Sequence, residues 1–272
     1  MAITTLDGVI AGAQFPQFFF KSASGTVAAG RAFSYWYKSG IPGAATIPTG
    51  STMAGDPLTA PVSGQIPYTN PTSPEVSYLA RLAAVSGAQG GTIILADRLW
   101  HNYGINMTST SPQTVNSATW PARDLDQSTD GRGIFIGVEV LTATGAASPT
   151  ITVSYTNSAG ASGRTGTNVI ATNGISAVAG TFYQIALEQD DAGVQSIQTI
   201  TLSASWLSGT AQLVAYRPIA AIMAPAAGVS SALDALTGGM PLVFDNSVPY
   251  VMLLPATTTS TPLSGNVTFT HG

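Results

Sequence analysis

The chain has 272 residues, of which 44% are hydrophobic and only 8% are charged, and it contains no cysteine. Ordinary soluble domains carry about a quarter charged residues, so the polar surface here must be built mainly from Ser, Thr, Asn, Gln and Gly. The lack of cysteine excludes disulfides, thiolate catalysis and cysteine-ligated zinc. The nine lysines and arginines are scattered and the net charge is -4, which argues against binding to nucleic acid.

No export signal and no membrane span are expected. The first twenty residues lack the basic start and the apolar run of a secretory peptide. The apolar stretch that begins at Ile219 is interrupted by Pro225 and falls far short of the ~20 residues that a membrane-spanning helix needs. Without an export signal, the glycosylation sequons at Asn106 and Asn266 carry little weight.

Residues 1–74 are predicted to form an extended arm. Prolines recur through its second half and disfavour long helices and central strands; they are Pro42, Pro48, Pro57, Pro61, Pro67, Pro71 and Pro74. Spaced apolar residues recur among them, namely Ile47, Met53, Leu58, Val62, Ile66 and Tyr68. A disordered linker is the alternative. We favour an arm that docks along another surface, because ordering such a segment requires contacts that offset its backbone entropy.

Aromatic residues of the arm form two groups, at 15–20 and at 33–37. The groups contain Phe15, Phe18, Phe19 and Phe20, and Phe33, Tyr35, Trp36 and Tyr37. Consecutive side chains of an extended segment point to opposite faces, so only alternate rings could share a sugar-binding platform. Anchoring in a partner or in the core suits these rings better than a ligand shelf. The sequence leaves open whether the arm docks on its own chain or on a neighbour.

Two short helices are predicted after the arm. Ser73 can cap the first, Pro74 suits its first turn, and Glu75 favours the positive end of the helix dipole. Its apolar face would contain Val76, Leu79, Ala80 and Ala83, and Gly87 would end it. The second helix is predicted over 230–237, ended by Gly238 and Gly239.

The remainder of the chain reads as β-strands. Apolar residues alternate with Thr and Ser, the period that turns one face of a strand inward. The side chains expected to face inward are Ile134, Ile136, Val138, Val140, Ile151, Val153, Tyr155, Ile200, Leu202 and Trp206. Further strands are expected at 92–98, 181–188, 211–217, 248–254 and 266–270. The fold class predicted is all-β: an antiparallel, jelly-roll-like sandwich over residues 75–272, with the arm at 1–74 and one or two short helices.

Histidine offers little for catalysis. His101 has Asp97 nearby in sequence, but the chain has no G-x-S-x-G nucleophile elbow. His271 is next to last in the sequence, so a two-histidine zinc site would need the C-terminal segment to fold back onto residue 101. We expect His101 to be a strand-end or loop residue with a satisfied hydrogen bond.

The acidic segment RDLDQSTDGRG at 123–133 resembles a calcium loop at first sight. Asp124, Asp126, Ser128 and Asp130 would be its ligands. Thr129 occupies the position that needs glycine and Phe135 the position that needs a bidentate glutamate. A polar turn that leads into the strand at 133–141 is the better interpretation, and we expect neither a metal nor a cofactor.

Paired carboxylates for glycoside hydrolysis would have to come from Glu139, Glu188, Asp190 and Asp191. Spacing in the sequence cannot tell whether two of them converge. Asp190 and Asp191 precede Ala192 and Gly193, which is typical of a loop tip. We therefore expect no catalytic residues and no enzymatic activity.

Three segments resemble virion structural proteins of tailed bacteriophages: GTIILADRLWHNYGIN at 91–106, PARDLDQSTDGRG at 121–133 and GVEVLTATGAASPTITVSYTNSAGASGRT at 137–165. The resemblance covers roughly residues 75–220 and includes no catalytic motif. It implies a capsid-associated role, as a decoration (cement) protein or as a minor head or tail component. Cement proteins of this kind often use β-sandwich, jelly-roll-like or β-tulip folds with arms that reach neighbouring subunits.

The resulting expectation is a non-enzymatic virion protein that strengthens the head lattice. Its partners would be the major capsid protein or other virion proteins, together with further copies of itself, a trimer being favoured. It would be assembled in the cytoplasm of a bacterial host and would contact neither nucleic acid nor membrane. A tail or fibre component and a carbohydrate-binding β-sandwich are the alternatives.

Overall fold

The computed structural model describes residues 3–48 and 52–272. Within them the chain is nearly all β, with antiparallel strands in two sheets and one short helix, α1 (Leu6–Ala11). The predicted all-β class is therefore confirmed. No helix among these residues is long and apolar enough to cross a membrane.

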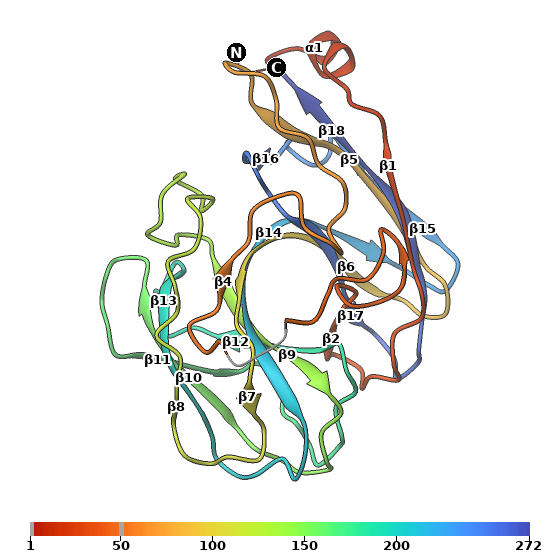
Figure 1. The fold of residues 1–272 in the computed structure, drawn as a ribbon. Coiled ribbons are helices and arrows are strands. Elements are labelled where there is room, and N and C mark those ends of the chain that lie inside the picture. The colour runs from red at the N-terminus through yellow and green to blue at the C-terminus, as the bar shows by residue number, and fades with distance from the viewer. Residues whose placement is uncertain (1–2, 49–51) are drawn as a thin grey trace.

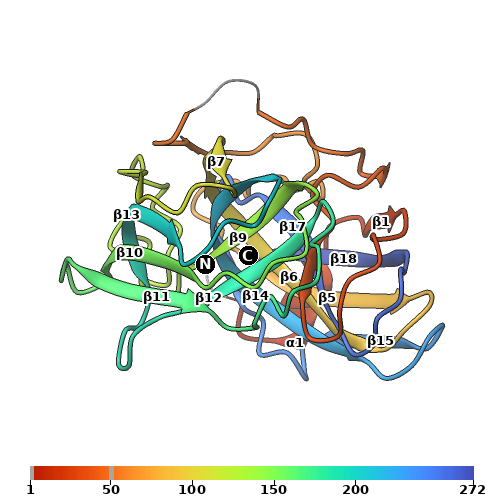
Figure 2. The ribbon, with the colours of Figure 1, turned by 90° about the horizontal axis from the view of Figure 1, so that it is seen from below.

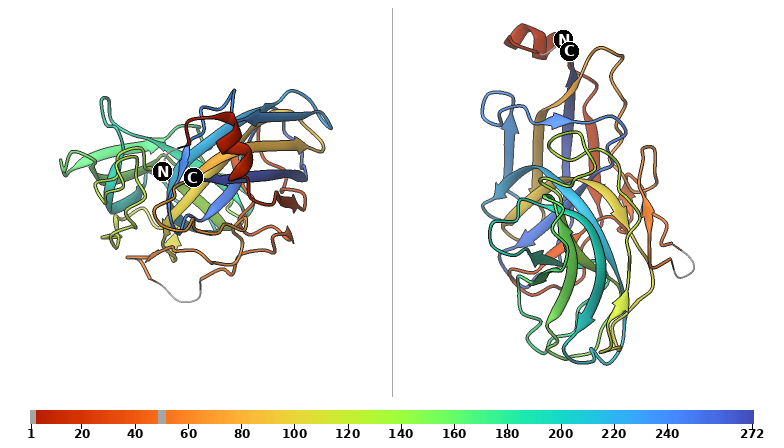
Figure 3. Two further views of the ribbon diagram at one scale, coloured as in Figure 1. Left: turned by 90° about the horizontal axis from the view of Figure 1, so that it is seen from above. Right: turned by 90° about the vertical axis from the view of Figure 1, so that its left-hand side faces the viewer.

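The first sheet forms the upper part of the molecule in Figure 1 and stands clear of the rest in the right-hand view of Figure 3. Its order is β15-β5-β18-β1-β3, and β16 also pairs with β5. The strands are β1 (Gln17–Lys21), β3 (Gly40–Ile41), β5 (Ser77–Ser86), β15 (Ser230–Asp234), β16 (Leu242–Val243) and β18 (Leu263–His271).

The second sheet has the order β2-β17-β6-β14-β9-β12-β11-β10-β13-β8, with β4 on β6 and β7 on β14. The strands are β2 (Ala32–Ser34), β4 (Asp56–Pro57), β6 (Gly91–His101), β7 (Ile105–Asn106), β8 (Gln113–Thr114), β9 (Phe135–Thr142), β10 (Ile151–Asn157), β11 (Arg164–Asn168), β12 (Thr181–Ala186), β13 (Val194–Leu202), β14 (Thr210–Ala224) and β17 (Pro249–Pro255). Because β2 pairs with both β17 and β12, strands β2, β17, β6, β14, β9 and β12 close into a barrel, visible as the ring in Figure 1.

Three clusters of buried apolar side chains hold these layers together. One lies between β9, β14 and the strands β10, β13 and β12, and all ten side chains predicted to face inward belong to it, each at most 1% exposed. A second lies between the first sheet and the strands β6 and β17. The third lines the inside of the barrel and includes Trp36, Phe182 and Tyr250. The period-two pattern therefore predicted the largest core correctly.

Both predicted helices are wrong. Residues 77–86 form β5, and 230–234 form β15, which pairs with it. The small residues Ala80, Ala83 and Ala84 mask a period-two pattern in which Leu82 and Ala84 are buried while Arg81 is exposed. Pairing with β18 over nine registered residues outweighs the local helix propensity of alanine and leucine. The helix that does form, α1, is capped by Thr5, whose side chain accepts a hydrogen bond from the Gly8 N–H at 3.1 Å.

The described part of the N-terminal segment 1–74 packs against its own chain. β1 pairs with β18, and β2 closes the barrel. Phe19, Tyr35 and Trp36 are each at most 2% exposed. Figure 2 shows the path of the segment from the first sheet to the barrel and on around its outside. The predicted boundary at residue 74 is a statement about independent folding, and it stays a prediction.

Candidate functional site

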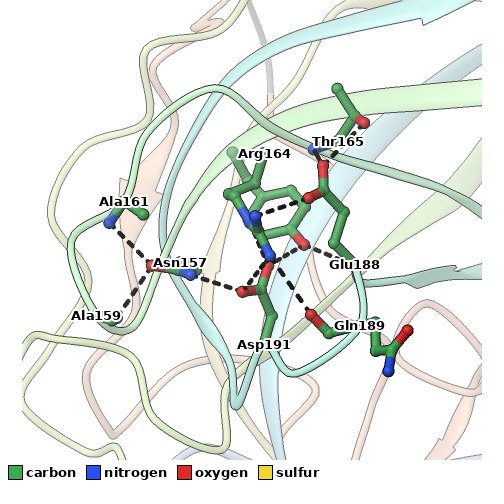
Figure 4. A network of polar contacts seen from close by, with 9 residues as sticks. Asn157, Ala159, Ala161, Arg164, Thr165, Glu188, Gln189 and Asp191 are labelled. Carbon is green, nitrogen blue, oxygen red and sulfur yellow. Dashed lines mark hydrogen bonds and ion pairs between the residues drawn. The ribbon is translucent and has the colours of Figure 1, made fainter.

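Glu188 and Asp191 do converge, and they converge on an arginine (Figure 4). Arg164 lies 2.9 Å from Glu188 and 3.0 Å from Asp191. Asp191 also accepts hydrogen bonds at 2.6 Å from the Tyr155 hydroxyl and at 2.6 Å from the Asn157 amide. The network ties β10 and β11 to the loop between β12 and β13.

The charges in this network suit a structural clamp. The Arg164 contact, followed by those of Tyr155 and Asn157, lowers the pKa of Asp191 to about 2. A general acid needs a raised pKa, so Asp191 is unsuited to protonate a leaving group. One oxygen of Glu188 accepts from the Thr165 N–H at 2.7 Å and the other faces Arg164. Both carboxylates thus use their oxygens in hydrogen bonds and ion pairs within the chain.

Asp190 and Glu139 are the other two carboxylates that the sequence offers for glycoside hydrolysis, and they take no part in the clamp. Asp190 occupies the loop tip with a positive φ of 69°, as the sequence predicts. Glu139 is fully buried inside the barrel, where its Oε2 accepts from Arg98 at 2.7 Å and from Gln212 at 2.7 Å. Glu139 and the clamp of Glu188 and Asp191 thus belong to separate networks.

Arg98 is the centre of a polar network inside the barrel. Its guanidinium lies 4.9 Å from the ring centroid of Trp36 and 5.5 Å from that of Tyr250. Tyr37 reaches the same network by a 2.9 Å hydrogen bond from Gln212. Trp36 and Tyr37 come from the predicted arm, so the second aromatic group fixes the arm to the barrel.

His101 lies at the end of β6 and is 7% exposed. Its Nδ1 accepts a hydrogen bond from Arg98 Nε at 3.2 Å. Burial and the neighbouring Arg98 charge lower the pKa of His101 to about 3, so the ring is neutral at pH 7. Asp97 does not orient it, because that carboxylate pairs with Arg123 at 2.9 Å. The prediction of a strand-end histidine with a satisfied hydrogen bond is confirmed.

The segment 123–133 is a turn wrapped around one carboxylate. Asp124 is fully buried and accepts hydrogen bonds from the backbone of Ser128 at 2.7 Å and of Gly131 at 2.9 Å. Asp126 pairs with Arg132 instead of turning toward Asp124. Across residues 3–48 and 52–272, no group of three or more His, Asp or Glu side chains gathers as metal ligands do. The polar turn predicted there is confirmed.

One hollow of the surface borders the clamp, with Glu188 and Asp191 in its wall, and another lies beside α1. One, of about 310 Å³, lies where β12 leaves β9 to pair with β11, and Phe135, Gln184, Glu188 and Tyr216 contribute to its walls. The Phe135 and Tyr216 rings lie 6.4 Å apart there. The other, of about 590 Å³, lies between α1 and the residues around His271. Both are open depressions with few groups suited to chemistry.

Large apolar side chains gather on β1 and its neighbour β3. Phe18 is 60% exposed, Phe20 52% and Ile41 64%, while Phe19 between the two phenylalanines is buried. Phe15 packs edge-on against Phe18, with centroids 6.4 Å apart. Alternation along the strand therefore splits the first aromatic group, as predicted: one ring anchors the core and the others face solvent. Sequence analysis missed the rest of this surface, because β5 and β15 were predicted to be helices.

No protein-family model matches the chain, and no curated protein matches it. Among solved structures, it is similar to the VP2 subviral particle of infectious bursal disease virus, with 10% identity, a TM-score of 0.17, and coverage of 94% of this chain and 79% of that one. The Gx strain of the same virus matches with 14% identity and a TM-score of 0.17, over 93% of this chain and 64% of that one. TM-scores of this size do not identify a shared fold.

Proposed function

We propose that this chain is a non-enzymatic structural protein of a virion, and specifically a decoration protein of a bacteriophage head. The observation that carries the proposal is the exposed apolar surface formed by Phe15, Phe18, Phe20 and Ile41 on a chain that is only 8% charged. Apolar side chains and uncharged amides and hydroxyls cost little to desolvate, so such a surface suits burial against other protein.

Two further observations support this role. Three of the four carboxylates considered for catalysis, Glu139, Glu188 and Asp191, pair with arginines of the chain, and Asp124 of the polar turn accepts from backbone N–H groups. In addition, the segments at 91–106, 121–133 and 137–165 resemble virion proteins of tailed phages. A protein that binds only the assembled shell stabilises it by RT ln(1 + [L]/Kd) at each site, repeated over many sites.

The test starts from particles purified from the phage whose genome encodes this chain. Peptide mass spectrometry should find the chain in the particles in many copies, and cryo-electron microscopy should place it on the head lattice. Absence from purified particles would overturn the virion role. Location on a tail or fibre would overturn the decoration role and favour the first alternative.

A binding assay with the purified chain separates the surface from the rest of the molecule. The double substitution Phe18→Ser/Phe20→Ser should reduce co-sedimentation with particles that lack the protein by at least about tenfold, a loss of about 1.4 kcal/mol of binding free energy. Val169→Ser is the matched control, because Val169 is 54% exposed and lies directly after β11, in the wall of the depression at Phe135 and away from the first sheet. Equal loss in both variants would argue against this surface.

Carbohydrate binding is the second candidate function, favoured by the depression at Phe135. The Phe135 ring offers a face on which a sugar ring can stack, and the Gln184 amide beside it offers a polar group at the edge of that face. Screening the chain against a glycan array tests it. Binding that disappears in Phe135→Ala and persists in Phe18→Ser/Phe20→Ser would favour this function over the first.

A further inference from the structure

One face of the first sheet packs on the second core cluster. The opposite, outer face is not covered by any of the three core clusters of the described residues. Its residues lie in three rows, because each row follows the strand register. The first row is Ile41, Phe20, Ser264, Val85 and Ser230; the second is Phe18, Asn266, Ala83 and Ala232; the third is Thr268, Arg81 and Asp234. We call these twelve residues the outer face.

Charge is nearly absent from the outer face. Only Arg81 and Asp234, neighbours in the third row, are charged, and their signs cancel. Lys21 follows Phe20 on β1, beside the short edge strand β3, a place where an exposed lysine would discourage association. Here its side chain is 2% exposed, and its ammonium donates to the carbonyl of Pro42 at 2.8 Å and of Gly43 at 3.2 Å. The Lys21 ammonium is therefore buried and leaves no exposed charge at this place on the sheet.

The outer face is also asymmetric in bulk. On the β3–β1 side it carries Ile41, Phe20 and Phe18, each more than half exposed. On the β5–β15 side its first two rows carry small side chains: Ala83 and Val85, and Ser230 and Ala232. One side therefore projects and the other is low, and β18 lies between them with Ser264, Asn266 and Thr268 on this face.

We propose that a second copy of this chain covers the outer face, with the two sheets packed face to face about a two-fold axis that runs along the strands near β18. In such a pair both copies use the same surface. If residue i of one copy contacts residue j of the other, then residue j of the first copy also contacts residue i of the second. The axis places Phe18 and Phe20 of one copy over Ala83 and Val85 of β5 in the other, and Ile41 over Ser230. Sheets pack face to face at about 10 Å, a spacing that large side chains opposite small ones can fill.

The outer face requires a partner that is uncharged and whose raised and low areas match its own. The outer face of a second copy meets both conditions. An acidic or basic partner would bury its charges against uncharged rows, which is costly. The two-fold arrangement differs from the trimer expected from the sequence. It rests on the proposed assembly role and names a second copy as the protein that buries Phe18 and Phe20; the loss of particle binding expected from Phe18→Ser/Phe20→Ser then follows from the loss of two-site attachment by the dimer.

Sedimentation velocity of the full chain tests the proposal. At concentrations of about 10 μM and above, the chain should sediment as a dimer, and Phe18→Ser/Phe20→Ser should sediment as a monomer with an unchanged circular dichroism spectrum. Val169→Ser should remain dimeric. A monomeric parent chain, a trimer, or a dimer that survives the double substitution would overturn the proposal.

Cross-linking tests the geometry without relying on a destabilising change. The chain has no cysteine, so one introduced thiol is unique. Asn266→Cys places it on β18, near the proposed axis, and a short bis-maleimide should join two copies efficiently. Ser162→Cys, on the exposed hairpin between β10 and β11, is the control and should give no covalent dimer. The opposite pattern would exclude the outer face as the interface.

The two proposals fail separately. A dimer through the outer face in a chain that is absent from virions would leave this inference standing and overturn the proposed function. A monomer in solution that decorates particles would do the reverse. Particle binding that competes with dimer formation would assign the outer face to another virion protein, and would overturn the two-fold pair as the assembled state.

Discussion

The chain has few charged residues, and two buried ion pairs among them fix the positions of side chains in its interior. Arg98 pairs with Glu139 and Arg123 with Asp97, and all four side chains are at most 3% exposed. Burying such pairs costs desolvation energy, which the additional hydrogen bonds from Gln212 and Ser247 help to offset. Around these fixed points, large apolar side chains provide most of the stability.

Trp206 is the first test of that core. Its side chain is fully buried, lies 5.2 Å from the Tyr183 ring, and has an indole N–H without a protein partner. Trp206→Ala should lower the free energy of unfolding by about 3–5 kcal/mol, because it removes buried area and leaves a cavity. Urea unfolding measures this. Leu207→Ala, at a neighbour that is 66% exposed, should change stability by less than about 0.5 kcal/mol.

His101 should make stability depend on pH between 7 and 5. The unfolded chain protonates this histidine near pH 6.5, whereas its pKa in the folded chain is about 3. The unfolded state therefore binds more protons in this range, and stability falls as the pH is lowered. The expected loss from His101 between pH 7 and pH 5 is about 2 kcal/mol.

His101→Gln isolates this contribution, because glutamine can still accept from Arg98 and does not titrate. Burial also lowers the pKa of His271, which adds a loss of the same sign. The variant keeps that part, so the difference between the two stability profiles measures His101 alone. Parallel profiles for the parent chain and the variant would show that His101 is not buried as described.

At the scale of elements, ion pairs and hydrogen bonds from a loop residue hold neighbouring strands together. The Asp191 carboxylate connects Arg164 of β11 with Tyr155 and Asn157 of β10. Asp191→Asn should cost about 1–3 kcal/mol, because it leaves the arginine and the tyrosine hydroxyl poorly satisfied. Asp190→Asn, one residue away at the exposed tip, should be nearly neutral. Thermal unfolding of the two variants compares them directly.

Removal of the N-terminal segment is the sharpest test at this scale. It would delete β1 and β2, and with them the buried rings of Phe19, Tyr35 and Trp36. We expect the fragment 75–272 to lack a cooperative thermal transition, since the barrel could not close. A fragment that melts cooperatively and keeps its β-sheet circular dichroism would instead establish the boundary predicted at residue 74.

The sequence allowed strands to be predicted where the alternation involved large residues, as in Ile151, Val153 and Tyr155. It misled where small residues hid the alternation, as in Ala83 and Ala84 of β5, because alanine favours helices locally and only pairing with β18 overrides it. The exposed rings at 18 and 20 follow from alternation alone. The rest of the outer face depends on residues far apart in the chain, such as Val85 and Ser264, whose pairing no local pattern encodes.

The described residues combine a closed barrel with an open sheet, and the open sheet exposes Phe18, Phe20 and Ile41 on one face. With few charges on that face, association through the outer face should depend weakly on ionic strength. The dimer dissociation constant should change by less than about threefold between low and high sodium chloride. Concentration-dependent sedimentation at the two salt levels measures it, and a strong weakening by salt would point to an interface built on charges elsewhere.

The barrel is closed by β2, whose Phe33 pairs with Thr181 on one side and Leu253 on the other. A residue near the start of the chain must therefore meet one near its end before the ring is complete. Contacts between such distant residues slow folding. On the ribosome, β2 leaves the exit tunnel long before β17 is synthesised, and the aromatic residues beside it spend that interval without their final partners. Closure of the barrel is thus a late event in the life of each nascent chain.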